Sequence, residues 1–266
     1  MYATHFFESR VLNTLRGTSA PGFGNLFVGL FLSNPTNTGA AGTELSYSGY
    51  ARQPITFSEP SATTLPSIQV QGGLSIHNTE TITWESAPSA AGTVRFIGIF
   101  DSAVGGNMLL YGELAVPLAI GSDQQPSILG QDIIYFAIGD SSLLFKTQIL
   151  NLLRGETMPG STPHLALFSG DPENAGVELS GPSYARATAT FGAPAVQVGG
   201  QSQIANTNFI QFPIPLAAWG NWAWDGVMSA ATGGVLLFKF QNPNPEIVHR
   251  NYVPQVHIGE YRLEVN

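Results

Sequence analysis

The chain has 266 residues, of which 43% are hydrophobic and only 11% charged, with a formal net charge of −8 and no cysteine. This is enough for one large domain or two ordinary ones, and the aromatic content argues against a disordered chain. The ten Lys and Arg residues are not clustered, so we do not expect nucleic acid or an anionic membrane as a partner. No apolar run is long enough to span a membrane. The absence of cysteine excludes disulfides and thiolate chemistry.

The first element that the sequence predicts is a helix over residues 4–16, "THFFESRVLNTLR". Its apolar side chains recur with helical spacing and form one stripe, made of Phe7, Val11, Leu12 and Leu15. Thr4 is suited to the N-cap, and Gly17 is suited to end the helix in the left-handed conformation.

The rest of the first 139 residues has a β-like pattern of short apolar or alternating runs separated by Gly, Pro, Asn and Ser. The same order of motifs then returns. "VLNTLRG" at 11–17 reappears as "ILNLLRG" at 149–155, and Tyr-Ala-Arg occurs at 50–52 and 184–186. We therefore predict a tandem duplication with one domain over 1–139 and a second over 140–266, each long enough to bury its own core. The short 138–142 junction, "IGDSS", favours a fixed arrangement of the two.

The second copy is expected to begin with its own helix. Asp140 or Ser141 is the predicted N-cap, Gly155 the predicted stop, and the predicted inward residues are Leu143, Leu144, Leu150 and Leu153. At the far end, "GQDIIYFA" at 130–137 is aligned with "GEYRLEVN" at 259–266. The predicted fold class is mainly β: two antiparallel, jelly-roll-like sandwiches, each preceded by one short helix.

Tyr-Ala-Arg is the sharpest polar feature because it is present in both copies. One interpretation makes Tyr50, Arg52, Tyr184 and Arg186 contacts for a partner, with the guanidinium fork binding carboxylates or carbonyls. The other has each Arg clamp a neighbouring loop while the Tyr packs. We favour the second interpretation, because a repeated internal feature more often maintains a fold.

Tryptophan is concentrated in "WGNWAW" at 219–224, which aligns with "GTVRF" at 92–96. Trp219, Trp222 and Trp224 are candidates for a sugar-stacking platform or a protein interface. Packing in the core is the favoured alternative. Strand alternation predicts that Trp222 and Trp224 share one face of the sheet.

No motif for catalysis, a metal or a cofactor stands out. The five histidines lack spaced partners, and "DPENAGVE" at 171–178 has three acids without the alternating ligand spacing of a calcium loop. No nucleophile elbow or phosphate-binding loop is present either. We expect a non-enzymatic protein without a bound metal or cofactor.

The motifs resemble a family of small bacteriophage virion structural proteins. The resemblance is carried by "VLNTLRGT" (11–18), "LFVGLFLSNP" (26–35), "GYARQPITF" (49–57), "GTVRFIGIFD" (92–101) and "GGNMLLYGEL" (105–114), and it is weaker in the second copy. It implies a virion component, assembled in the host cytoplasm, that belongs either to the capsid surface or to a tail fibre.

The leading hypothesis is a capsid decoration or cement protein that bridges neighbouring capsid subunits. Its partners would then be the major capsid protein and other virion proteins, and a homo-oligomer is allowed. The alternative is a tail fibre or receptor-binding protein whose 219–224 aromatics contact a host glycan.

Overall fold

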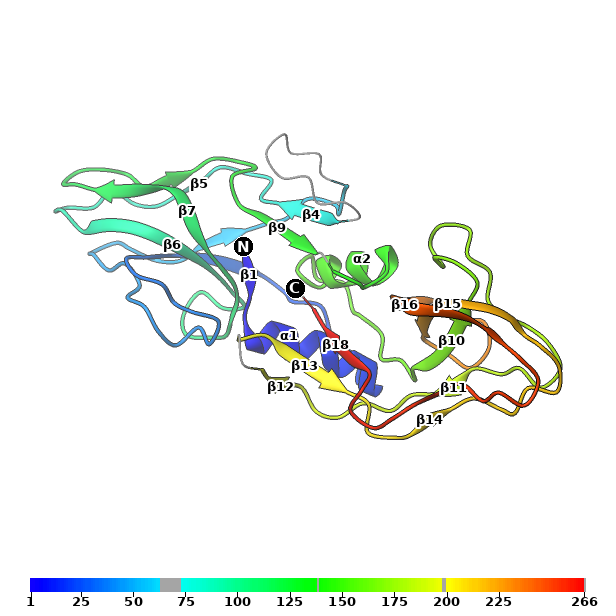
Figure 1. Ribbon diagram of the computed structural model, residues 1–266. Coiled ribbons are helices and arrows are strands. Elements are labelled where there is room, and N and C mark those ends of the chain that lie inside the picture. The colour runs from blue at the N-terminus through cyan, green and yellow to red at the C-terminus, as the bar shows by residue number, and fades with distance from the viewer. Residues whose placement is uncertain (63–72, 138, 198–199, 266) are drawn as a thin grey trace.

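A computed structural model describes residues 1–62, 73–137, 139–197 and 200–265 (Figure 1). Ile138 of the predicted junction and Asn266 of the predicted last strand lie outside the described residues. The chain forms a mainly β structure of antiparallel sheets with two short helices, so the predicted fold class is confirmed.

The first copy forms one five-stranded sheet, in the order β1-β7-β6-β2-β3, and two small sheets, β4–β9 and β5–β8. Its elements are β1 (Tyr2–Ala3), α1 (His5–Leu12), the 3₁₀ turn η1 (Asn13–Arg16), β2 (Leu26–Phe31), β3 (Gln53–Ile55), β4 (Leu74–His77), β5 (Ile82–Thr83), β6 (Gly92–Phe100), β7 (Met108–Ile120), β8 (Ser127–Ile128) and β9 (Ile134–Ala137).

The second copy repeats this plan with the sheet β11-β10-β15-β16 and the small sheets β12-β13-β18 and β14–β17. Its elements are α2 (Leu143–Leu152), β10 (His164–Phe168), β11 (Ala187–Thr188), β12 (Ala195–Val196), β13 (Ser202–Ala205), β14 (Ile210–Gln211), β15 (Gly220–Met228), β16 (Leu236–Val248), β17 (Gln255–Val256) and β18 (Arg262–Glu264).

Both helices are capped by a hydroxyl side chain, and the caps of the two copies are equivalent. Thr4 caps α1 by accepting from the Phe7 N–H, and Gly17 ends the turn with φ 85°. In α2 the cap is Ser142, which accepts from the Phe145 N–H at 3.1 Å, so the prediction of Asp140 or Ser141 was wrong.

The late start of α2 changes its inward face. Leu143 and Leu144 are exposed, contrary to prediction, while Leu150 and Leu153 are buried as expected. Phe145 and Ile149 are buried instead. The helix begins after the Ser142 cap, so Leu143 and Leu144 lie in its exposed first turn, and Phe145 and Ile149, four residues apart, share the face that packs inward. The predicted stripe of α1 is confirmed, since all four of its residues are buried.

The C-terminal strands are equivalent in a register one residue away from the predicted one. Asn78 bonds through its backbone and its carboxamide to Ile133, and Asn206 bonds in the same way to Tyr261. The turn before each strand requires a left-handed residue, which is Gln131 in one copy and Gly259 in the other. The sequence alignment matched Gly259 to Gly130 because it paired glycine with glycine.

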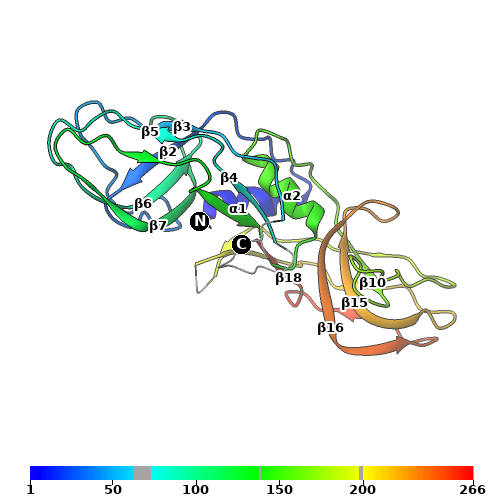
Figure 2. The same ribbon diagram turned by 90° about the horizontal axis from the view of Figure 1, so that it is seen from above.

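Each helix packs on a small sheet of the other copy. α1 contacts β13 and β18 of the second copy as well as β7 of its own, and α2 contacts β4 and β9 of the first copy as well as β16 of its own. Figures 1 and 2 show the result: a central waist of helices and small sheets, with a large sheet on either side. We call these two outer parts the first and second lobes.

The two copies meet through equivalent residues at the waist. Ala20 and Met158 exchange two backbone hydrogen bonds of 2.9 and 2.8 Å, although they belong to different copies. Phe23 N–H donates to Leu152 O at 2.9 Å, and the matching Ser161 N–H donates to Thr14 O at 2.8 Å. Such reciprocal contacts are those of an isologous, twofold interface.

The main hydrophobic core joins both copies. Val11 and Leu12 of α1, Phe145 and Leu150 of α2, and core residues of both large sheets belong to one buried cluster. A second, small cluster lies on each large sheet, and it contains Phe31, Phe100 and Met108 in the first copy. The division at 139/140 stays a prediction about the folding units, because the helices of the two copies are exchanged.

Candidate functional site

The Tyr-Ala-Arg motif of the first copy forms an intramolecular clamp. Arg52 binds the Glu44 carboxylate through two hydrogen bonds of 2.9 and 2.8 Å, and its remaining Nη1 donates to Gly105 O at 2.7 Å. Tyr50 accepts from the Leu30 N–H at 2.9 Å and donates to Glu44 at 3.1 Å. The motif thus ties the loop before β3, strand β2 and the β6–β7 hairpin together.

The second copy repeats this clamp atom for atom. Arg186 binds Glu178 at 2.8 and 2.7 Å and donates to Gly233 O at 2.6 Å, while Tyr184 donates to Glu178 at 3.0 Å. The hydrogen bonds and the charge of Glu178 raise the pKa of the Arg186 guanidinium, and burial raises the pKa of Tyr184.

Both guanidinium groups are therefore committed within the chain. The exposed fraction of the side chain is 11% for Arg52 and 9% for Arg186. The Arg52 guanidinium also lies over the Phe100 ring, 3.3 Å from its centroid. These contacts are the loop-clamping role that the sequence favoured, and a contact of either Arg with a partner stays a prediction.

Trp219 lies in the core. Only 4% of its surface is exposed, its indole N–H donates to Pro182 O at 3.1 Å, and its ring meets Tyr184 edge-on at 5.1 Å between centroids. Trp219 and Tyr184 thus belong to one packed unit beside the Arg186 clamp.

Trp222 and Trp224 lie on opposite faces of their sheet, so the prediction of a shared face was wrong. A β-bulge between them shifts the pairing with β16, from Trp224 opposite Gln241 to Trp222 opposite Glu246. Trp222 packs against the main core, whereas Trp224 joins the small outer cluster with Phe168. A bulge reverses strand alternation locally, and both indoles remain half-buried.

Asp225 is the polar partner of Trp222. The Trp222 indole N–H donates to the Asp225 carboxylate at 2.8 Å, and burial raises the pKa of this carboxyl to about 6. The equivalent residue of the first copy is the buried Ile97. Ile97 is paired with Leu30 and Gly112 in the register in which Asp225 is paired with Leu167 and Phe240. The second lobe has thus gained a titrating group inside its sheet.

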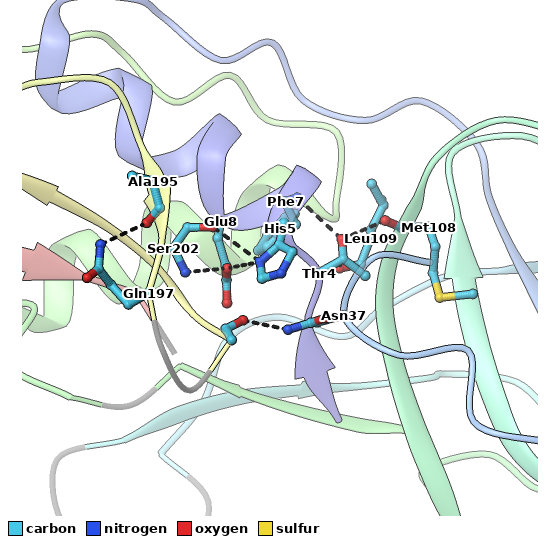
Figure 3. A network of polar contacts seen from close by, with 11 residues as sticks. Thr4, His5, Phe7, Glu8, Asn37, Met108, Leu109, Ala195, Gln197 and Ser202 are labelled. Carbon is cyan, nitrogen blue, oxygen red and sulfur yellow. Dashed lines mark hydrogen bonds and ion pairs between the residues drawn. The ribbon is translucent and has the colours of Figure 1, made fainter. Parts of the chain in front are cut away.

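A buried polar network, which the sequence did not predict, joins α1 to the second copy (Figure 3). Glu8 has 4% of its side chain exposed, contacts His5 at 3.2 Å and accepts from the Ser202 N–H at 2.8 Å. Nearby, the Asn37 carboxamide donates to Gly200 O at 2.5 Å. The equivalent of Glu8 in α2 is the buried Lys146, so the same helical position carries opposite charges in the two copies.

Four apolar side chains are exposed on the second lobe where the first lobe has small or polar residues. Ile214 and Leu216 flank Pro215, whose C=O accepts a hydrogen bond from the Asn251 N–H. The same bond joins the Asp123 N–H to the Ala87 C=O in the first copy, and this fixes which residues of the two copies are equivalent. The exposed fractions are 58% for Ile214, 60% for Leu216, 50% for Ile247 and 42% for Tyr252. Their counterparts are Ser86, Pro88, Ala119 and Gln124. We call these four residues the apolar tip.

The acidic loop at 171–178 is neutralised by cations of the chain. Lys239 binds Asp171 at 2.8 Å and Glu173 at 3.1 Å, while Glu178 binds Arg186. Among the described residues, no group of three His, Asp or Glu side chains could hold a metal ion. No helix in the described part of the chain is long and apolar enough to cross a membrane.

The geometry defines a duplicated, β-rich scaffold with the same clamp built into both copies, and the family match makes it a structural protein of a bacteriophage virion. The chain belongs to the family described as podophage GP4 fiber I protein gp80, whose family model matches residues 2–135 and 141–264. The two matched segments confirm both the tandem duplication and the resemblance to phage virion proteins. No curated protein matches the sequence.

Proposed function

We propose that this protein is a non-enzymatic component of a phage fibre, in which two lobes are held rigidly by a shared waist. The observation that carries this proposal is the match of both copies, 2–135 and 141–264, to a family described as a podophage fiber protein. The protein acts in the virion, after assembly in the host cytoplasm, through contacts with other virion proteins.

The architecture supports a rigid spacer between two binding ends. The exchanged helices and the common core oppose independent motion of the lobes, because neither helix can leave without exposing the other copy's sheet. The lobes also differ chemically, since only the second carries the apolar tip. Exposed apolar groups of this kind are typical of protein interfaces, so we assign attachment to the second lobe.

Among the sequence candidates, the half-buried Trp222 and Trp224 are the better proposed partner contacts, because each presents an amphipathic ring near the surface. Tyr50, Arg52, Tyr184, Arg186 and Trp219 support the lobes that present such contacts.

A capsid decoration protein is the second candidate function. It is favoured by the pseudo-twofold arrangement, in which two similar lobes are fixed at either side of a waist. Two such lobes would match two similar sites on neighbouring subunits of the major capsid protein. Two fixed sites raise the effective concentration of each lobe for its own subunit.

Electron cryomicroscopy of intact particles tests the two candidates. Density for this chain at a fibre, with the second lobe against its neighbour, supports the proposal. Density spread over the shell in contact with two capsid subunits replaces it with the decoration role.

A matched pair of variants tests the polarity of attachment. Ile247→Glu places a charge in the apolar tip, and Ala119→Glu places the same charge at the equivalent exposed position of the first lobe. We expect Ile247→Glu to reduce incorporation into virions and Ala119→Glu to leave it unchanged. Equal incorporation of the two variants would contradict attachment through the second lobe.

A further inference from the structure

An open cleft of about 440 Å³ lies between strands β3 and β5 of the first lobe. It is lined by Gln53, Pro54, Ile55, Thr56, Asn78, Glu80, Thr81, Ile82 and Thr83. Both strands are sheet edges on this side, because β3 pairs only with β2 and β5 pairs only with β8 among the described strands. The cleft is therefore walled by two strand edges that face each other.

The β3 edge offers one acceptor and one donor to the cleft. In the β2–β3 register Phe27 is opposite Pro54, and since proline has no N–H this pair is not hydrogen-bonded. The Pro54 C=O and the Thr56 N–H consequently point away from β2. Within the described residues no hydrogen bond involves either group.

The second copy shows what fits at this position. There the equivalent groups are Thr188 C=O and Thr190 N–H, and the side chain of Asn208 bridges them. Its Nδ2 donates to Thr188 O at 2.9 Å, and its Oδ1 accepts from Thr190 N–H at 2.8 Å and from the Thr190 hydroxyl at 2.9 Å. One carboxamide therefore forms hydrogen bonds with both of the backbone groups that this strand edge presents.

In the first copy the position of Asn208 is occupied by Glu80. The equivalence is fixed by Asn78 and Asn206, whose carboxamides donate to Glu80 O and Asn208 O at the same distance of 2.8 Å. A carboxylate has no hydrogen to donate to Pro54 O, and Glu80, at the rim of the cleft, is exposed. The substitution leaves the cleft open while its hydrogen-bonding groups are retained.

The width of the cleft excludes an inserted strand. β3 and β5 approach within 8 Å between Cα atoms, whereas a strand placed between them needs roughly 9.6 Å, twice the usual spacing. A single side chain fits. A primary amide is suited to the site because it has its carbonyl oxygen and one N–H on the same edge, whereas a trans secondary amide directs them to opposite sides.

We propose that this cleft of the first lobe binds the side-chain carboxamide of an Asn or Gln residue of a neighbouring virion protein, in the way that Asn208 fills the second lobe. The identity of the neighbour as a virion protein rests on the proposed function, whereas the carboxamide preference of the cleft does not. The first lobe then has a partner site that the second lobe fills for itself.

The amide preference is tested by nuclear magnetic resonance on the full chain with ¹⁵N-labelled threonine. Acetamide is the probe, and N-methylacetamide, a trans secondary amide, is its control. We expect a saturable shift of the Thr56 N–H with acetamide only, while Thr190 N–H, already bound by Asn208, does not respond. The absence of a saturable shift, or an equal response to N-methylacetamide, would overturn the proposal.

Two variants locate the effect at Glu80. In Glu80→Asn the new carboxamide should bind Pro54 O and Thr56 N–H as Asn208 binds their equivalents, which should abolish the shift of Thr56 N–H with acetamide. Glu80→Ala removes the charge without adding a carboxamide and should retain that shift. In virions, Glu80→Asn should weaken attachment of the neighbour about tenfold relative to Glu80→Ala, as expected for the loss of one bidentate pair. Acetamide binding together with equal incorporation of both variants would refute a virion partner at the cleft, without affecting the location of the protein in the particle.

Discussion

Two glycines at the waist have no space for a methyl group. A Cβ on Gly22 would lie 2.0 Å from the Gly155 carbonyl carbon, and a Cβ on Gly160 would lie 2.4 Å from Gly17 O. The obstacles are backbone atoms of the other copy, so no side-chain rotation can relieve the overlap. We predict that Gly22→Ala forces the two copies apart and destabilises the whole chain.

The magnitude follows from the bonds beside the contact. Restoring a normal carbon–carbon separation requires a shift of about 1.5 Å. A shift of this size breaks the two Ala20–Met158 bonds and the bond from Phe23 N–H to Leu152 O, which are 2.8 to 2.9 Å long. At about 1 kcal/mol each, their loss lowers the free energy of unfolding by about 3 kcal/mol. For a chain of this size that corresponds to a fall of roughly 6–12 °C in the melting temperature.

The assay is thermal unfolding followed by circular dichroism, with Gly24→Ala as the matched control. A Cβ on Gly24 meets no atom within 4 Å, so this variant should melt at or slightly above the wild-type temperature. Gly160→Ala should behave as Gly22→Ala does, because the two positions are equivalent. Melting of Gly22→Ala within a degree of Gly24→Ala would refute the close contact of the copies.

Three further predictions concern charge and chain connectivity. Because burial raises the pKa of Asp225 to about 6, above the unfolded value of about 3.9, the folded state is stabilised at low pH and loses about 2 kcal/mol as the pH rises through 6. Urea unfolding at pH 4.5 and 7.5 should show this decrease smaller by about 2 kcal/mol in Asp225→Asn than in the wild type, and an identical pH dependence in the two proteins would contradict the assignment. Arg186→Met removes the clamp and should lower the free energy of unfolding by about 2 kcal/mol, a loss that should shrink in the Glu178→Gln background; an unchanged loss would show that the pair is not coupled. Residues 1–139 and 140–266, expressed as separate chains, should co-purify in equal amounts and each fail to fold alone, and a well-folded isolated half would contradict the exchange of helices.

Local signals in the sequence predicted the features that depend on neighbouring residues. The stripe and caps of α1 follow from spacing and from Thr4 and Gly17, and the repeated Tyr-Ala-Arg motif pointed to a clamp. The faces of Trp222 and Trp224 could not be predicted, because the bulge depends on the extra residues of β16 across the sheet. The register of the last strand was missed because Gln131 adopts the left-handed conformation that usually indicates glycine.

The candidate sites depend even more on distant residues. Glu8 meets Ser202 only because α1 crosses to the other copy, and no periodicity within either copy contains that information. The clue to the amide cleft was available as the change from Asn208 to Glu80, but its meaning required the edge groups of β3 to be located first.

The exchange of helices also constrains how the protein is made. Helix α1 leaves the ribosome well before its covering strands, because β13 and β18 follow it by roughly 190 to 250 residues in the chain. At 5–20 residues per second, the apolar stripe of α1 waits roughly 12–50 seconds for its partner sheet. The small sheet β4–β9 likewise lacks its covering helix until α2 has been synthesised. The packing of α1 on the other copy is therefore delayed until β18 has been synthesised, and the nascent chain exposes the apolar stripe of α1 throughout that interval.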